Sequence, residues 1–296
     1  MYYTHSNMTK LENIEKRIES DLRSRLDGSG IMYRLFSRVK TRRSIEHKMS
    51  IKRDAYRAGK MIMQDIIGFR IVLYFQDDVD IVALYLSSKG LVRKSVDEPD
   101  AITFRPQRLN LTLQLPKEMV EDFRSELPEE YSQYIGSTYE VQIRTIFSEG
   151  WHEVEHDLRY KCKEDWIGYE SYSRILNGVL GTLETAEWSM KSLFDELAMK
   201  NCQMGNFRAM FRNKFRIRFA NDDFSEPVRM YLESNPDVTH SILEMDRTML
   251  LFTLLNHPDV MPLTFDNILF ILNRIELMKE AISKLEPATF SAKFLD

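Results

Sequence analysis

The sequence predicts an α+β fold, with strands concentrated in the first half of the chain and helices throughout the second. Residues 69–75 (FRIVLYF) are rich in β-branched and aromatic side chains, as in a buried strand. Residues 138–144 (TYEVQIR) alternate like a strand with one buried face. From residue 170 onward, apolar residues recur every three or four positions, which is the helical period. We therefore expect an α/β region over roughly 1–165, followed by helices.

An amphipathic helix is predicted over residues 7–27, before the first strand. Its apolar positions, spaced by three or four, are Leu11, Ile14, Ile18, Leu22 and Leu26. The run Asp27-Gly28-Ser29-Gly30 should end this helix, because glycine favours a helix terminus. The predicted N-terminal helical segment is therefore 1–30.

Shorter elements follow in order. Strands are expected at 33–39, 69–75, 91–96, 101–104, 109–115 and 138–144, and helices near Ser44 and over 52–63, 78–88 and 145–162, with a polar segment at 116–137. Helical patterns continue at 170–200, 224–233, 238–256 and 264–285. The predicted divisions are a sheet-containing domain (31–165), a connecting helix (166–205) and an α-helical C-terminal domain (206–296).

Composition is that of an ordinary globular protein, with 43% hydrophobic and 29% charged residues. A net charge of −4 argues against extensive coating of nucleic acid. The polar N-terminus lacks the apolar segment of a signal peptide, and no apolar run is long enough to span a bilayer. Two cysteines without metal-ligand spacing suggest reduced thiols. We therefore expect a cytoplasmic protein without a membrane partner.

Four short segments carry residues suited to chemistry, and the first is basic. Arg38, Lys40, Ser44 and Lys48 lie close together in the chain. Arginine can stack on a base and also bind a phosphate, while lysine supplies a point charge for a polyphosphate. A solvated basic helix face would give the same pattern.

The second segment enters the strand at 69–75. Asp65 comes just before this strand, where its carboxylate could hold Mg²⁺ rigidly. Gly68 would let a nucleotide approach the backbone, and Arg70 follows it. The alternative is an aspartate that caps a turn and an arginine at a sheet edge.

The third segment places three polar side chains on one strand face. Glu140, Gln142 and Arg144 alternate with Val141 and Ile143. They would point together into one polar site, or simply towards solvent.

The fourth segment contains His152-Glu153-Val154-Glu155-His156, which matches the HExxH pattern of zinc proteases. A zinc protease would need a third ligand downstream, and the later histidines, His240 and His257, lie in the helical tail. The metalloprotease interpretation is therefore disfavoured.

Together and in this order, the segments resemble the synthetase domain of the RelA/SpoT family. The family's runs are RVK…S…K, D-I-x-G-x-R, E-x-Q-I-R-T and W-x-x-x-E-H-x-x-x-Y-K. Their matching residues here are Arg38, Lys40, Ser44, Lys48, Asp65, Gly68, Arg70, Glu140, Gln142, Arg144, Thr145, Trp151, Glu155, His156, Tyr160 and Lys161. The resemblance covers about residues 35–165. It implies a mixed, nucleotidyltransferase-like sheet and the synthesis of ppGpp or pppGpp, with the HExxH helix closing the site.

The resemblance also implies roles for residues. Arg38 and Arg70 would sandwich the adenine of ATP, with Lys40 and Lys48 on its phosphates. Asp65 would hold Mg²⁺, and Glu140 would be the second carboxylate or the base. The implied catalytic residues are Asp65, Glu140 and Gln142, the implied metal ligands are Asp65 and Glu140, and the implied nucleotide-binding residues are Arg38, Lys40, Ser44, Lys48, Gly68, Arg70, Arg144 and His156.

One region departs from the family pattern. Members carry a G-Y-x-S-x-H run whose tyrosine stacks on the guanine of GDP or GTP, whereas residues 105–112 read RPQRLNLT here. Losing that stack removes roughly 1–3 kcal/mol of binding. The acceptor could therefore be a guanine nucleotide, an adenine nucleotide or the 3′ end of tRNA. A pseudo-synthetase that only binds nucleotide or RNA is the non-enzymatic alternative.

A basic and aromatic stretch in the tail bears on the tRNA alternative. Over 207–219, phenylalanines at intervals of four alternate with Arg208, Arg212, Lys214, Arg216 and Arg218. This pattern predicts an amphipathic helix whose basic face either is merely solvated or contacts a phosphate backbone such as that of tRNA. Homo-oligomers are also possible for such a chain.

Overall fold

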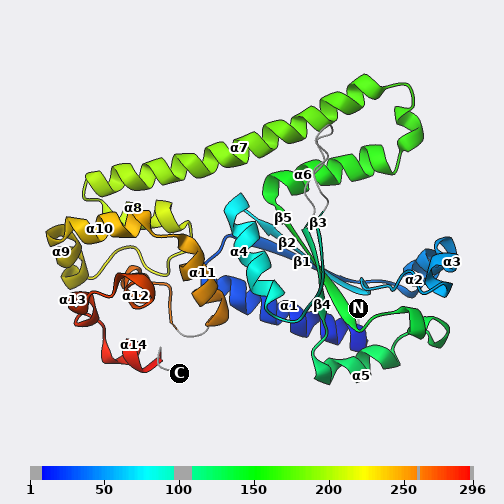
Figure 1. The fold of residues 1–296 in the computed structure, drawn as a ribbon, viewed down its shortest axis with the longest axis horizontal. Helices are drawn as coiled ribbons and strands as arrows, with labels where there is room; N and C mark the ends of the chain where they lie inside the picture. Colours follow the sequence, from blue (N-terminus) through cyan, green and yellow to red (C-terminus); the bar gives the residue numbers. More distant parts are fainter. Residues whose placement is uncertain (1–8, 97–108, 259–260, 294–296) are drawn as a thin grey trace, which may run out of the picture. The chain divides into compact units, whose positions relative to one another are not determined.

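The computed structural model describes residues 9–96, 109–258 and 261–293 (Figure 1). The chain forms two compact units, each built from three separate segments. The first unit comprises Met1–Arg23, Arg34–Val72 and Leu86–Cys162, and the second comprises Ser24–Tyr33, Leu73–Tyr85 and Lys163–Asp296.

A five-stranded sheet forms the centre of the first unit. Its strands are β1 (Tyr33–Val39), β2 (Ile67–Leu73), β3 (Leu91–Val96), β4 (Leu109–Gln114) and β5 (Thr138–Thr145). Their order in the sheet is β1-β2-β5-β4-β3. β4 is antiparallel to both of its neighbours, whereas the bridge between Met63 and Ile135, just before β2 and β5, is parallel. The predicted mixed sheet is confirmed.

The two central strands separate apolar from polar residues, as the period of a strand requires. On β2, Ile67, Phe69 and Ile71 are buried, and on β5 so are Val141 and Ile143. The residues between them are only half-buried at several positions, which leaves a polar face for the site described below.

Helices of the first unit are short. They are α2 (Arg42–Ile51), α3 (Arg53–Arg57), α5 (Lys117–Ser125), the 3₁₀-helix η1 (Glu129–Tyr134), α6 (Ile146–Glu155), the π-helix η2 (His156–Tyr160) and the first part of α1 (Lys10–Ser29). α1 lies beside β1, since Ser37 donates to Glu19 at 3.1 Å. All five predicted apolar positions of α1 are buried.

Two local expectations were wrong in detail. The helix predicted near Ser44 is α2, whereas the helix predicted over 52–63 is shortened to α3, with Gly59 at a positive φ of 67° beyond its end. The polar segment at 116–137 contains α5, which buries Met119 and Phe123. The strand predicted at 101–104 lies outside the described residues.

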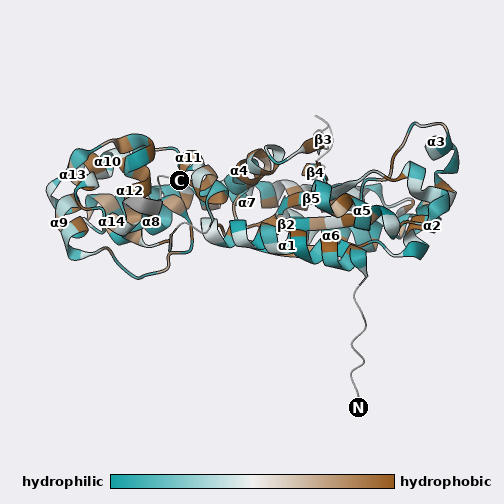
Figure 2. Cartoon of the chain, turned by 90° about the horizontal axis from the view of Figure 1, so that it is seen from below, coloured by the Kyte–Doolittle hydropathy of each residue, from teal (hydrophilic) through white to brown (hydrophobic). Residues whose placement is uncertain are grey.

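The second unit is helical in its C-terminal part, as predicted. Its helices are α4 (Gln76–Ser87, all but the last two residues), α7 (Glu170–Gln203), α8 (Phe207–Phe215), α9 (Glu226–Ser234), α10 (Pro236–Glu244), α11 (Arg247–Asn256), α12 (Phe265–Leu272), η4 (Asn273–Leu277), α13 (Glu280–Ser283) and α14 (Ala288–Lys293). The 3₁₀-helix η3 (Lys163–Trp166) precedes α7. Hydrophobic residues on α12 are visible in Figure 2, and six of its eight residues are buried. The ring of Phe265 stacks on Phe219 at 4.1 Å between centroids.

The basic face expected over 207–219 is not a continuous solvated surface. α8 ends at Phe215 because Arg216 adopts a left-handed conformation, with φ 50°. The side chain of Arg216 is buried, and Lys214 donates to the carbonyl of Leu243. Only the earlier cations of the stretch, such as Arg208 and Arg212, remain exposed on the helix. The prediction of one basic helix face through residue 218 was therefore wrong.

No helix in the described part of the chain is long and apolar enough to cross a membrane.

Candidate active site

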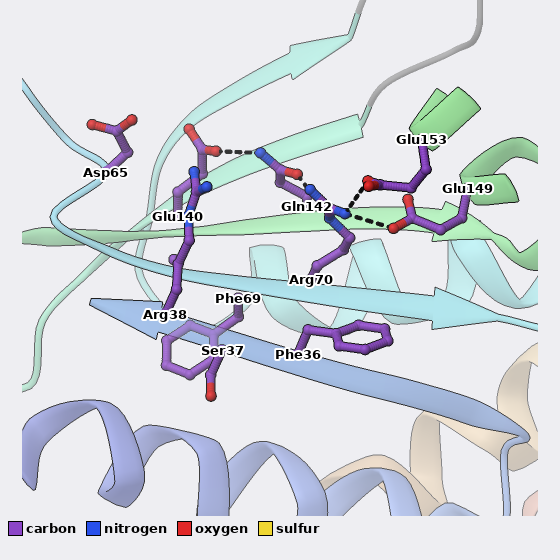
Figure 3. Close-up of a pocket in the computed structure, with 11 residues that line it drawn as sticks. Phe36, Ser37, Arg38, Asp65, Phe69, Arg70, Glu140, Gln142, Glu149 and Glu153 are labelled. Carbon is purple, nitrogen blue, oxygen red and sulfur yellow. Dashed lines mark hydrogen bonds and ion pairs between the residues drawn. The ribbon is translucent and has the colours of Figure 1, made fainter. Parts of the chain in front are cut away.

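A cavity of about 470 Å³ opens on the polar face of the sheet in the first unit (Figure 3). It is lined by Phe36, Ser37, Arg38, Asp65, Gly68, Phe69, Arg70, Glu140, Gln142, Glu149 and Glu153. These residues come from β1, from the segment entering β2, from β2 itself, from β5 and from α6. Six of them were predicted from the sequence as site residues: Arg38, Asp65, Gly68, Arg70, Glu140 and Gln142.

Asp65 is held by two lysines at the wall of this cavity. The ammonium of Lys40 lies 2.7 Å from Oδ2 of Asp65, and that of Lys48 lies 2.9 Å from the same oxygen and 3.0 Å from Oδ1. Lys40 follows β1, and Lys48 lies on α2, whose N-terminus is capped by Thr41. Burial disfavours ionisation of Asp65, but the hydrogen bonds from both lysines outweigh it, so the pKa of this carboxyl lies below its ordinary value.

The cluster around Asp65 carries excess positive charge. An isolated ion pair raises the pKa of its amine, yet the pKa of Lys40 is lowered, first by burial and then by the charges of Lys48 and Arg38, despite the hydrogen bond to Asp65. The upward pKa shift expected for a simple pair is absent mainly because Lys40 is partly buried, and the two neighbouring cations add to this effect. The arrangement suits an additional anionic group such as a phosphate.

On β5, three polar side chains form one hydrogen-bonded row. Gln142 donates to Glu140 at 2.8 Å, and Arg144 donates to Oε1 of Gln142 at 3.1 Å. Arg70, on the neighbouring strand, donates to the same oxygen at 3.3 Å. The predicted common face of these three β5 residues is observed, and Gln142 is its central member.

Two glutamates on α6 that were not among the predicted site residues fix the arginines. Glu149 accepts from Arg70 at 2.6 Å and from Arg144 at 2.7 Å, and Glu153 accepts from Arg70 at 2.6 Å. The helix begins directly after β5, with a capping box formed by Thr145 and Ser148. The available signal was the four-residue spacing of two acids on a helix that starts beside Arg144.

Arg38 and Phe36 shape the other side of the cavity. A Cβ atom on Gly68 would lie 3.7 Å from Nε of Arg38, so glycine here keeps space open beside the guanidinium. Phe36 is 53% exposed, which is unusual for phenylalanine, and it lines the cavity with the buried Phe69. Planar groups and a cation therefore border the same space, which suits an aromatic base.

A second cavity of about 500 Å³ shares Arg38, Arg70, Gln142 and Glu153 with the first. Its other lining residues are Asn110, Arg144, His152, His156, Asp157, Tyr160 and Lys161. The rings of His156 and Tyr160 stack with centroids 5.6 Å apart and planes 12° apart. Arg144 and His156, both predicted as nucleotide-binding, thus line this cavity rather than the first.

Ser44 lies apart from both cavities. Its hydroxyl is 2.9 Å from that of Thr41, and its backbone N–H donates to the same threonine at the start of α2. A nucleotide-binding role for Ser44 therefore stays a prediction.

The unusual acceptor segment is described only in part. Residues 105–108 lie outside the described residues, while the remainder of the segment begins β4, where Leu109 and Leu111 are buried.

For the HExxH pattern, the described residues include no group of three or more histidine, cysteine or acidic side chains that could hold a metal ion.

Comparisons with known proteins identify the region that carries the site. Residues 37–165 match the family model described as "Region found in RelA / SpoT proteins". No curated protein matches the chain significantly.

Among solved structures, small alarmone synthetase 1 from Bacillus subtilis is 23% identical, with 63% of this chain and 93% of that chain covered and a TM-score of 0.43. A GTP pyrophosphokinase family protein from Streptococcus pneumoniae is 19% identical over 63% of this chain and 88% of that chain, with a TM-score of 0.44. Small alarmone synthetase 2 from Bacillus subtilis is 22% identical over 62% of this chain and 97% of its own, with a TM-score of 0.43. The family match spans all four segments of the site, so residues 37–165 of this chain are similar to the RelA/SpoT region.

Proposed function

We propose that the RelA/SpoT-type domain transfers pyrophosphate from ATP to the 3′-hydroxyl of an acceptor nucleotide. The observation that carries this proposal is the cluster at the wall of the first cavity, in which Asp65 is bound by Lys40 and Lys48 with Arg38 close by. Phosphoryl transfer depends mainly on positioning and on neutralising phosphate charge, and this cluster has positive charge in excess of its carboxylate.

The first cavity is suited to the donor. The adenine of ATP would lie between Arg38 and Arg70, beside the exposed ring of Phe36. Arg70 is already oriented by Glu149 and Glu153, so it would need little reorganisation to receive a base. The triphosphate would extend towards Lys40 and Lys48.

The carboxylates of the cavity fit Mg²⁺ in its usual protein setting, which is one or two carboxylates with the substrate's phosphates completing the shell. Asp65 and Glu140 line the same cavity and would hold the ion. When bound, Mg²⁺ neutralises charge on the phosphates during transfer. Lys40 and Lys48 would then exchange Asp65 for phosphate oxygens, since both oxygens of Asp65 are engaged by lysines before substrate binds.

The chemical step is a displacement at the β-phosphorus of ATP. The acceptor's 3′-oxygen forms the new P–O bond, the bond from the β-phosphorus to the oxygen bridging to the α-phosphate breaks, and AMP leaves. Glu140 takes the proton of the 3′-hydroxyl, and Gln142, which donates to Glu140 at 2.8 Å, keeps this carboxylate in place.

The second cavity is suited to the acceptor because it shares a wall with the first. Arg144 and Lys161 would bind the acceptor's phosphates, close to the stacked rings of His156 and Tyr160. We propose GDP or GTP as acceptor and a (p)ppGpp-like product. An adenine nucleotide is the other small acceptor that these groups can bind.

Transfer to tRNA finds less support. It would draw on the basic stretch at 207–218, but Arg216 there is buried and ion-paired, and Lys214 is bonded to a backbone carbonyl. The stretch therefore offers fewer cations to a phosphate backbone than the sequence suggested.

Label transfer tests the proposal directly. The full chain would be incubated with Mg²⁺ and γ-labelled ATP, in parallel with GDP, GTP, ADP, unlabelled ATP and bulk tRNA, and the products would be separated by chromatography. We expect label to move to GDP or GTP with release of AMP, and transfer by the Asp65→Asn variant to be at least about a hundredfold slower. If no acceptor gains label while ATP still binds, the domain is a binding module and the proposed reaction is wrong.

A further inference from the structure

The second unit contains a cavity of about 480 Å³ that has no part in the proposed reaction. Its walls come from α4, α7, α10, α11 and the end of α8. The charged lining residues are Asp77, Lys191, Asp195, Lys214, Arg216, Glu244, Asp246 and Arg247, accompanied by His240 and Thr248. The apolar ones are Ile81, Met199, Leu243 and Met245.

Two of the lining carboxylates are joined to buried arginines. Asp77 is ion-paired with Arg216 and, at 3.0 Å, with Arg247. Asp195 lies 2.8 Å from Arg216 and 2.8 Å from Lys191. Asp77 and Asp195 are thus shared among Arg216, Arg247 and Lys191, and Arg247 also pairs with Asp78.

The remaining two carboxylates also have partners. Asp246 caps the N-terminus of α11 by accepting from Thr248, and Glu244 lies 3.5 Å from His240. None of the four acids that line the cavity forms an ion pair with Lys214, although Asp195 and Asp246 lie near enough to act on its charge.

Lys214 is the exception among the cations of this cavity. It donates to the carbonyl of Leu243, but it forms no ion pair with any residue in the described part of the chain. Burial lowers the pKa of its ammonium, helped by the charge of Arg216, and this exceeds the opposing influence of Asp195 and Asp246. An ammonium that is partly removed from water and forms no direct ion pair is stabilised when an anion binds beside it.

The apolar side chains define the rest of the ligand. Met199 from α7, Leu243 from α10 and Met245 from the turn before α11 face the same space as Lys214. Methionine adapts its shape to a bound apolar group more easily than branched residues do. We propose that this cavity binds a small organic anion, whose carboxylate or phosphate pairs with Lys214 and whose apolar part contacts Met199 and Met245.

Methionine methyl groups report directly on this cavity. The full chain would be labelled with ¹³C in the methionine methyls, and the signals of Met199 and Met245 identified from Met199→Leu and Met245→Leu. Hexanoate and n-hexyl phosphate would be titrated against the neutral hexanamide and against inorganic phosphate. We expect at least one organic anion to shift both signals saturably, with hexanamide and inorganic phosphate each binding at least about tenfold more weakly. The preferred anion tells whether the ligand carries a carboxylate or a phosphate.

The Lys214→Met variant tests the role of Lys214, because it keeps an unbranched side chain of nearly the same length and removes the charge. It should bind the preferred anion at least about tenfold more weakly than the wild type. Lys200→Met is the matched control, since Lys200 lies on α7 outside the cavity and pairs with Glu196. Its affinity should equal that of the wild type.

Two results would overturn the proposal: no shift of the Met199 and Met245 signals by either anion at about 10 mM, or equal binding of hexanoate and hexanamide by the wild type. If Lys214→Met fails to fold, comparing hexanoate with hexanamide on the wild-type protein still tests whether the cavity prefers an anion. Neither measurement involves nucleotide transfer, so the outcome is independent of the proposed reaction.

Discussion

The two units each enclose a cavity of similar volume, about 470 Å³ in the first and about 480 Å³ in the second, and both are lined by charges of either sign. They differ in how deeply their arginines are buried. In the first unit, the side chain of Arg70 is 28% exposed, whereas in the second those of Arg216 and Arg247 are 2% and 7% exposed. The two cavities thus contain similar charged residues in environments that differ in solvent access.

Burial decides whether an ion pair can exchange its partner. A partly solvated pair is worth little to stability, so Asp65 can release its lysines to a substrate at small cost. Arg216 and Arg247 are deeply buried, so removing either one takes an ion-pair partner away from carboxylates inside the second unit. We therefore expect changes in the first cavity to affect catalysis and changes in the cavity of the second unit to affect folding.

The largest effect should come from the carboxylates of the first cavity. Asp65→Asn and Glu140→Gln should each lower the rate of transfer by two to four decades, or about 3–5 kcal/mol of barrier, because metal binding and proton removal depend on them. The rate would be measured with saturating Mg²⁺ and ATP, and unfolding by urea should show little change. Wild-type turnover in either variant would contradict the assignment.

The cavity of the second unit should show the reverse behaviour. Arg216→Met should lower the free energy of unfolding by about 1–3 kcal/mol, because it leaves Asp195 with only Lys191 and Asp77 with only Arg247. Arg212→Met is the matched control, since Arg212 pairs with the fully exposed Asp222 at 3.4 Å and should change stability by less than about 1 kcal/mol. If urea denaturation shows equal effects for the two substitutions, the buried ion pairs of Arg216 contribute no more to stability than the exposed pair of Arg212.

Burial of Asp78 should make the stability of the fold depend on pH. This residue of α4 is fully buried, and burial raises the pKa of its carboxyl to about 6, although Arg247 lies 2.8 Å away. Between about pH 4 and pH 6 the unfolded chain has lost this proton and the folded chain keeps it, so stability should fall as the pH rises. The loss should be about 3 kcal/mol in total and absent from Asp78→Asn.

Urea denaturation of both proteins across this pH range would measure the difference. A wild-type stability that rises with pH relative to Asp78→Asn would show that the carboxylate, and not the neutral acid, is the form stabilised by folding.

The smallest expected effect concerns recognition of the donor. Arg38→Ala and Arg70→Ala should raise the KM for ATP about tenfold and leave the KM of the acceptor nearly unchanged, because stacking on a base contributes roughly 1–3 kcal/mol. Initial rates with each substrate varied in turn would separate the two constants. Arg70 also pairs with the glutamates of α6. If the Arg70→Ala variant melts at a lower temperature but keeps the wild-type KM for ATP, the role of Arg70 is purely structural.

The sequence predicted much of the first cavity because its residues are local to strands. The two-residue period of a strand places Glu140 and Gln142 on one face of β5, and it likewise places Gly68 and Arg70 on one face of β2. Glu149 escaped prediction because its role depends on how α6 leaves β5, which alternation of residues cannot specify.

The tail illustrates the opposite limit. Phenylalanines at intervals of four predict a helix through Phe219, yet α8 stops at Phe215. Arg216 takes a left-handed conformation and pairs with Asp77, a residue far away in the sequence. Such tertiary contacts override local periodicity, and they cannot be predicted from a local sequence pattern.

The interleaving of the two units limits how this protein can be rearranged. Segments 24–33 and 73–85 lie within the first half of the chain but belong to the second unit. A chain cut near residue 163 would keep these segments while losing the helices against which Phe75 and Asp77 pack. A single cut therefore does not separate the helical C-terminal region from the rest of the chain as an independent module. Acquisition of this region requires matching changes in α1 and α4, so the two halves of this chain are expected to diverge together.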